Sequence, residues 1–240
     1  MSRVRISMLL LAVLSVASCK SDTTSSSPTR FAGAAVTIGS GTANTWLTTD
    51  ASGNTTAIGV TISDAALASL GTKDSMYMLA MPTGVLSAFK SVGLDYATHD
   101  AAPYNKPHID PHFMLLSDAA LMGTMSGGMD GKMPTNMMFP SGYVTDSVIE
   151  PMMGVHWMDT TGSEFHGTPF QCAFEYGAWN GNMAFYEVMC DKASLDGHKG
   201  ITNTIRKATM MSGMMMFMPS SYKISYDAIA KTSTIELDGF

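Results

Sequence analysis

Histidine and carboxylate side chains gather in one proline-bounded stretch, residues 104–113, which reads YNKPHIDPHF. His108, Asp110 and His112 follow one another at intervals of two, and alternate residues of an extended strand face the same side. His108 with Asp110, or Asp110 with His112, could therefore chelate one ion. His108 and His112 are too far apart to do so unless Pro111 bends the chain. Imidazole and carboxylate ligands suit zinc, iron, copper or manganese.

Two later segments each place one polar residue among apolar neighbours. His156 stands in GVHWMD, and Glu187 stands in FYEVM. A buried carboxylate usually needs a partner, so Glu187 is a plausible anionic ligand. The predicted metal ligands, with zinc ranked first, are His99, His108, Asp110, His112, His156 and Glu187. Cupins also assemble their metal sites from separate strands, but no His-X-His pair occurs here, so the comparison is one of architecture only.

Each of these residues also has a structural explanation. A histidine on an apolar strand can be a core residue that is hydrogen-bonded to a backbone carbonyl. Glu187 could pair with a lysine, or face Glu175, which would raise a carboxylate pKa. The metal site therefore competes with a metal-free structural or ligand-binding protein, which could be a homo-oligomer. His166 and His198 lie in glycine-containing segments and are expected to face solvent.

Methionine suggests a third hypothesis, because it accounts for 23 of the 240 residues. Thioethers are soft ligands for Cu(I), so the Met-rich segments 122–138 and 210–216 could capture copper. Methionine also fills irregular gaps in protein cores, and its spread along the chain favours that explanation. The sequence contains no nucleophile elbow, phosphate loop, dinucleotide fingerprint or HExxH motif.

The N-terminal residues resemble a bacterial export signal. Arg3 and Arg5 precede an apolar stretch, residues 6–17, that is too short to span a bilayer. Residues 14–19 resemble a lipobox, so we expect residues 1–18 to be cleaved and Cys19 to be lipid-modified; the alternative is cleavage without lipid. Residues 19–30 are rich in Ser and Thr and are expected to form a tether. This predicts a lipid-anchored protein of the cell envelope, at the outer membrane in a Gram-negative organism.

The charge balance restricts the class of partner. Loss of Arg3 and Arg5 with the signal would take the formal net charge from −6 to −8. An acidic chain argues against nucleic-acid binding, which needs a basic face. Charged residues make up 14% of the chain and hydrophobic residues 45%, which is typical of a protein with a compact core.

Gly, Pro, Asn and Asp interrupt the chain at short intervals and leave little room for long helices. We predict a single mainly β domain (α+β class) over residues 31–240, with antiparallel sheets in a sandwich or barrel. Two short helices are expected at residues 64–70 and 118–123, capped by Ser63 and Ser117, and a long loop at residues 121–139. The predicted strands are 34–38, 45–49, 57–61, 76–81, 111–116, 155–159, 222–227, 232–237 and the two arms of a hairpin.

A cysteine stands at each end of that hairpin. Cys172 and Cys190 flank two strand-like segments joined by a turn that contains Asn180 and Gly181. A turn centred on Gly181 would place the cysteines directly opposite each other. Export would permit a disulfide; the alternative is two buried free thiols.

Several of these segments resemble a bacterial family of exported proteins, a domain of unknown function typified by a sigma-E-regulated protein of a thermophile. The resemblance covers residues 37–240 and is carried by AIGV at 57–60, the helix at 65–70, PHIDPHF at 107–113, MGVHWMD at 153–159 and the hairpin from Tyr176-Gly177 to FYEVM at 185–189. Members of that family carry a Gly-His-Glu-Pro-like segment where this chain has His99, and Glu-Pro-Met where it reads Glu187-Val188-Met189. The family has no settled activity, so the resemblance implies an intact fold and a grouping of the histidines.

Overall fold

The computed structural model describes residues 28–98, 100–126, 137–145, 147–210 and 217–240. Cys19, the expected signal, most of the expected tether and His99 lie outside these residues. In the described part, no helix is long and apolar enough to cross a membrane.

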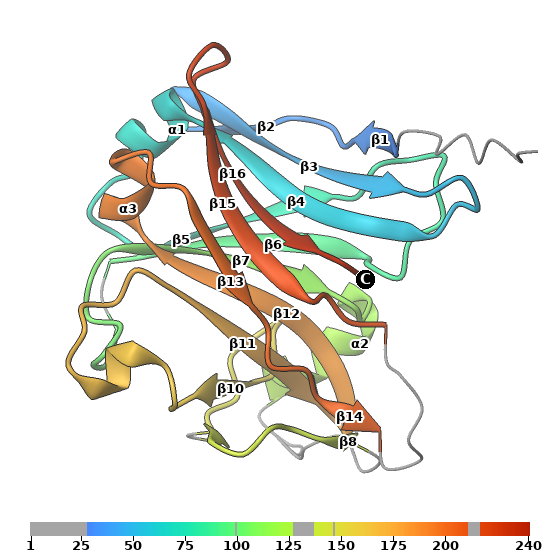
Figure 1. Cartoon of the computed structure of the whole chain (residues 1–240), viewed down its shortest axis with the longest axis vertical. Coiled ribbons are helices and arrows are strands. Elements are labelled where there is room, and N and C mark those ends of the chain that lie inside the picture. The colour runs from blue at the N-terminus through green and yellow to red at the C-terminus, as the bar shows by residue number, and fades with distance from the viewer. Residues whose placement is uncertain (1–27, 99, 127–136, 146, 211–216) are drawn as a thin grey trace, which may run out of the picture.

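Two antiparallel sheets lie face to face, as Figure 1 shows, which confirms the predicted mainly β sandwich. The first sheet has the order β1-β3-β4-β16-β15-β13, with β2 paired to β3. Its strands are β1 (Thr29–Ala32), β2 (Val36–Ile38), β3 (Gly41–Thr49), β4 (Thr55–Ser63), β13 (Ile201–Thr204), β15 (Ser221–Asp227) and β16 (Thr232–Asp238). Alternate side chains of β16, such as Ile235 and Leu237, are buried in the core between the sheets.

The second sheet positions the candidate site. Its order is β5-β6-β7-β12-β11-β10-β9. Its strands are β5 (Ser75–Ala80), β6 (Ser91–Ala97), β7 (His108–Met114), β9 (Tyr143–Val144), β10 (Val155–Asp159), β11 (Cys172–Trp179) and β12 (Asn182–Asp191). Two short strands, β8 (Met137–Met138) and β14 (Thr209–Met210), pair with each other beside it.

The central strands of the second sheet are buried on both faces. All seven residues of β7 are buried, and so are the nine residues of β12 after Asn182. On β7, Ile109 and Phe113 join the core between the sheets. His108, Asp110 and His112 alternate with them and therefore point to the opposite face. Two smaller apolar clusters, one containing Leu121 and Phe185 and the other Tyr104 and Phe170, are built partly from connecting segments. Polar side chains on this face are consequently enclosed.

Short helices follow the strands β4, β7 and β12 along the chain. α1 (Asp64–Ser69) and α2 (Asp118–Leu121) begin as predicted, because the Ser63 hydroxyl accepts from the Ala66 N–H at 3.2 Å and the Ser117 hydroxyl from the Ala120 N–H at 3.3 Å. The segment predicted as a loop, residues 121–139, contains the 3-10 helix η1 (Met122–Ser126) and β8, and its residues 127–136 lie outside the described part of the chain. A further 3-10 helix, η2 (Ser163–His166), and α3 (Lys192–Asp196) complete the elements.

The structure departs from the predictions at several further points. Residues 29–30, expected in the tether, belong to β1, where pairing of Thr29 with Thr49 and of Arg30 with Thr48 supplies the backbone partners that the local composition does not suggest. β6 was not predicted, because Gly93 and Asp95 interrupt its apolar pattern. The short α3 was not predicted either; its first turn is capped by Asp191, which accepts from the Ser194 N–H at 2.8 Å.

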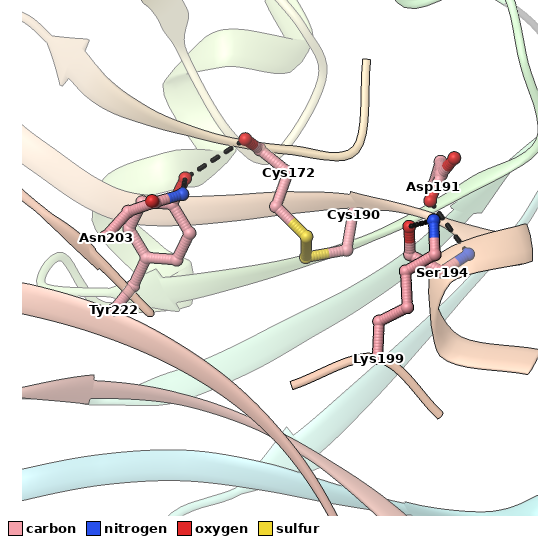
Figure 2. The surroundings of a disulfide bond; sticks show 7 residues. All are labelled: Cys172, Cys190, Asp191, Ser194, Lys199, Asn203 and Tyr222. Atoms are coloured by element: carbon pink, nitrogen blue, oxygen red, sulfur yellow. Dashed lines mark hydrogen bonds between the residues drawn. A yellow bond between two sulfur atoms is a disulfide. The ribbon is translucent and has the colours of Figure 1, made fainter. Parts of the chain in front are cut away.

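A disulfide joins β11 and β12, the two strands of the hairpin. Cys172 and Cys190 are directly opposed in register, with Cα atoms 4.1 Å apart, and Figure 2 shows the bond between them. The Tyr222 hydroxyl donates to the Cys172 carbonyl at 3.0 Å and accepts from the Asn203 amide at 2.6 Å. The start of β11 is thereby fixed both to its own hairpin and to the facing sheet.

Removal of this disulfide is expected to destabilise the protein. The bond closes a loop with a sequence separation of 18 residues, for which loss of the cross-link costs about 3 kcal/mol of unfolding free energy. The measurement is urea unfolding of the oxidised chain, the reduced chain and the Cys172→Ala/Cys190→Ala variant. The last two should unfold together at lower urea; coincident oxidised and reduced curves would contradict the prediction.

Candidate metal centre

Three side chains from three strands converge on the enclosed face of the second sheet. His112 of β7 and Glu187 of β12 are directly opposed in register. His156 comes from β10, one strand further away, because β11 lies between β10 and β12. The His112 and His156 Nε2 atoms are 3.3 Å apart, and Glu187 Oε2 lies 3.4 Å from the first and 3.3 Å from the second. The three atoms form a nearly equilateral triangle.

A glycine makes this convergence across β11 possible. Gly177 pairs with His156 on one side and with Phe185 on the other. A side chain at Gly177 would collide with the Phe185 ring, which lies with its centroid 4.9 Å from each of the two histidine rings. The Phe185 ring thus occupies the space that a Cβ would fill and packs against both imidazoles.

The backbone orients one of the imidazoles. His112 Nδ1 lies 2.9 Å from the carbonyl oxygen of Asp110. A carbonyl can only accept, so Nδ1 carries the hydrogen and donates it. In the neutral ring, Nε2 is then left with a lone pair directed into the triangle. A histidine that binds a metal commonly has its other ring nitrogen held in this way.

The triangle is closed to solvent except at one corner. The side chains of His112 and Glu187 are only 3% and 2% exposed, whereas that of His156 is 20% exposed. An ion or a water molecule would therefore reach the site from the His156 side.

Burial and mutual charge set the protonation of the three residues. Burial lowers the pKa of His112. Burial also lowers the pKa of His156, but the charge and the hydrogen bond of Glu187, with smaller contributions from other acids, together outweigh burial and raise the pKa to about 9. Burial alone would raise the pKa of Glu187, yet His112 and His156 lower it to about 2. Glu187 therefore remains a carboxylate in the interior of the protein.

A second glutamate lies directly opposite Glu187. Glu175 of β11 pairs with it in register and is 2% exposed. Burial, followed by the charge of Glu187, raises the pKa of the Glu175 carboxyl to about 8. The two glutamates thus face each other across the hairpin, and the raised pKa falls on Glu175, which is largely protonated at neutral pH, and not on Glu187.

The structure brings together only part of the predicted ligand set. His112, His156 and Glu187 form one group that could hold a metal ion. His108 and Asp110 share the same face of β7 but stand apart from this group: His108 contacts Asp110 and Asp100 instead. β7 runs unbroken through Pro111, so His108 and His112 stay about 13 Å apart along the strand. His166 and His198 are exposed, as expected, and His198 stacks on Tyr226.

Some residues around the site were not identified from the sequence. Asp95 and Asp100 were not singled out, because isolated acids near strand ends usually face solvent. Gly177 and Phe185 gave no local signal of their role beside the two imidazoles.

No family model, curated protein or solved structure matches this chain. Its function has to be inferred from its own residues.

Gly177→Ala is expected to disturb the triangle and to destabilise the fold. The new methyl group would have to displace the Phe185 ring, which packs against both imidazoles. Overpacking of this kind costs about 1–3 kcal/mol of stability. Thermal unfolding measures the stability loss, and the imidazole NMR signals of His112 and His156 report the displacement. Gly53→Ala, at an exposed turn where no atom would meet the new methyl group, should leave those signals unmoved. Unchanged imidazole signals in Gly177→Ala would contradict the assignment.

Proposed function

We propose that this chain is an exported, lipid-anchored protein of the cell envelope that binds a divalent transition-metal ion, zinc by preference, through His112, His156 and Glu187. The observation that carries the proposal is the triangle with sides of 3.3, 3.3 and 3.4 Å. Zinc binds nitrogen and oxygen ligands at about 2.0–2.1 Å in a tetrahedral arrangement, which separates ligand atoms by about 3.3–3.4 Å.

Hydrogen bonding alone explains the contacts among His112, His156 and Glu187 less well than a bound metal ion does. A proton on His156 Nε2 can be donated to Glu187 or to His112, but not fully to both. Glu187 Oε2 is buried and has no aligned hydrogen bond among the described residues, although both imidazole nitrogens lie within 3.4 Å of it. One cation at the centre of the triangle would satisfy all three atoms together, and it would neutralise the buried carboxylate.

The ligand types favour zinc, and they leave room for a fourth ligand. Two imidazole nitrogens and one carboxylate oxygen form a set of the kind that holds catalytic zinc, in which water takes the fourth position. The 20% exposure of His156 provides the side from which that water would enter. Metal-bound water loses a proton more easily than free water.

The envelope location rests on other observations. Arg3, Arg5, the apolar residues 6–17 and Cys19 resemble the parts of a lipoprotein signal. The disulfide between Cys172 and Cys190 agrees with an oxidising compartment, because such bonds are rare in the cytosol. The resemblance to an exported bacterial family points the same way.

Substitution of a ligand should lower the bound zinc by one equivalent. After a zinc soak and removal of free ions, His156→Ala should carry one zinc per chain fewer than the wild type by elemental mass spectrometry. His166→Ala, at an exposed histidine of η2, is the matched control and should carry as much as the wild type.

Chelation gives the corresponding stability measurement. A site filled at 100 times its dissociation constant contributes about 2.7 kcal/mol to stability. Addition of a chelator should therefore lower the melting temperature of the wild type more than that of His156→Ala. A wild type with no affinity for Zn, Cu, Mn or Fe, or equal zinc in His156→Ala, would refute the proposed site.

Copper binding by methionine is a second candidate, and one observation favours it. The two Met-rich segments are distant in sequence, yet β8 pairs with β14, so that Met138 is opposite Thr209 and Met210 opposite Met137. Residues 127–136 and 211–216 lie outside the described part of the chain. Met122, Met125 and Met138 are more than half exposed, which is unusual for side chains whose role is to fill the core.

The copper candidate predicts a loss of Cu(I) affinity when exposed thioethers are removed. Met122→Leu/Met125→Leu/Met138→Leu keeps the apolar volume but removes three sulfur ligands. Competition with a coloured Cu(I) chelator should show weaker binding by this variant. Met76→Leu/Met78→Leu, at two exposed methionines of β5, should bind as the wild type does. Equal affinity in all three proteins would exclude this candidate.

A further inference from the structure

A cleft of about 510 Å³ lies between the segment that leads into β7 and the segment that follows β10. The first segment lines it with residues from 102–106 and the second with residues from 164–170. Clefts that bind small molecules are commonly of this size, with largely apolar walls and a few polar groups that fix the orientation of the ligand. His112, His156 and Glu187 do not line it, so it is separate from the candidate metal centre.

One acid and one base line this cleft without an ion-pair partner. Glu164 and Lys106 are both partly buried, yet neither side chain forms an ion pair with another residue in the described part of the chain. They do not pair with each other either. The cleft therefore presents one negative and one positive group that are both available to a ligand.

Glu164 in particular is placed where its charge needs compensation. Burial raises the pKa of its carboxyl above the ordinary value, and the charge of Asp159 adds to this effect. The carboxylate lies over Gly162, so close that its oxygens stand within 2.7 Å of the position that a Cβ of this glycine would take. It is thus held at the wall of the cleft, where a cationic group of a ligand would replace part of its lost hydration.

The walls beside the two charges are apolar. Phe165 and Phe170 both pack edge-on against Tyr104, with ring centroids 5.9 and 4.9 Å away. Pro103 and Pro169 extend the same lining. Aromatic and proline surfaces of this kind suit the hydrocarbon part of a small ligand.

Backbone hydrogen bonds hold both sides of the cleft in place. The Lys106 N–H donates to the Tyr104 carbonyl at 2.8 Å, and the Thr168 N–H donates to the Ser163 carbonyl at 3.1 Å. A cleft that is already formed loses less conformational entropy when a ligand binds, which favours affinity.

We propose that this cleft binds a small zwitterion, an amino acid or a short peptide, with its ammonium group at Glu164 and its carboxylate at Lys106. The ligand ammonium donates to the Glu164 carboxylate, and the ligand carboxylate accepts from the Lys106 ammonium. Hydrogen bonds between charged groups are stronger than those between neutral ones. A ligand with a single charge would use only one of the two groups. The inference does not depend on the metal site.

Blocked forms of one ligand test each charge in turn. The probes are phenylalanine and the dipeptide phenylalanyl-alanine, each compared with its N-acetyl and its carboxamide derivative in NMR titrations of the full chain. A free probe should bind and shift the amide signals of Gly167 and Thr168, which line the cleft. Either block should weaken binding about tenfold or more, because it removes a hydrogen bond between charged groups. Binding of phenylalanine would assign an amino-acid site, and binding of the dipeptide alone a peptide site.

Two variants assign the two contacts. Glu164→Gln should bind the free probe no better than the N-acetyl derivative, and Lys106→Gln should bind it no better than the carboxamide. Each variant should still discriminate against the other block. Lys73→Gln and Asp118→Asn, at exposed side chains outside the cleft, are the matched controls and should bind as the wild type does.

Glu164 and Lys106 are only partly buried, so both variants should keep the melting temperature of the wild type. Absence of binding by both free probes, or equal binding of free and blocked probes by the wild type, would overturn the inference. Unchanged discrimination in either Glu164→Gln or Lys106→Gln would overturn it as well.

Discussion

Glu187 carries a negative charge into the protein interior, and the arrangement around it depends on how that charge is compensated. Its side chain is 2% exposed, and an unpaired ion at such a position costs several kcal/mol. His112 and His156 compensate it, which is why the Glu187 pKa falls to about 2 despite burial. Burial, followed by the same charge, raises the pKa of Glu175 on the neighbouring strand to about 8. Burial and this one carboxylate together set the protonation of the residues that surround it.

Burial of both faces of β7 and β12, in the centre of the second sheet, creates this situation. In a two-layer sandwich, the strand face that points away from the core is usually solvated, and polar residues there cause no strain. Here the apolar clusters around Phe185 and Phe170 enclose that face. The polar side chains of β7 and β12 must consequently find partners among themselves or bind a cation. The proposed metal site follows from this constraint.

β7 contributes a histidine to each of two clusters, because alternate residues of a strand face the same side. His108, Asp110 and His112 share a face, and backbone carbonyls orient both imidazoles. Pro111 fits within the strand without breaking it, so the strand remains extended. Extension keeps His108 away from His112 and makes two clusters where a bend would have made one.

Local sequence determined much of the fold. The hairpin turns at Asn180-Gly181 as expected, but that turn pairs Trp179 with Asn182. The β-bulge between Gly177 and Ala178 then shifts the register by one residue, and only this shift places Cys172 opposite Cys190. Ser63 and Ser117 begin their helices because a capping hydroxyl acts on a neighbour three residues away. The types of the site residues were also evident, since polar groups stand out in apolar strands. Their grouping was not evident: His156 reaches His112 only because β10 lies beside β11 and Gly177 leaves space for Phe185. Strand order and packing across the sheet join residues far apart in sequence, and only the tertiary structure could decide them.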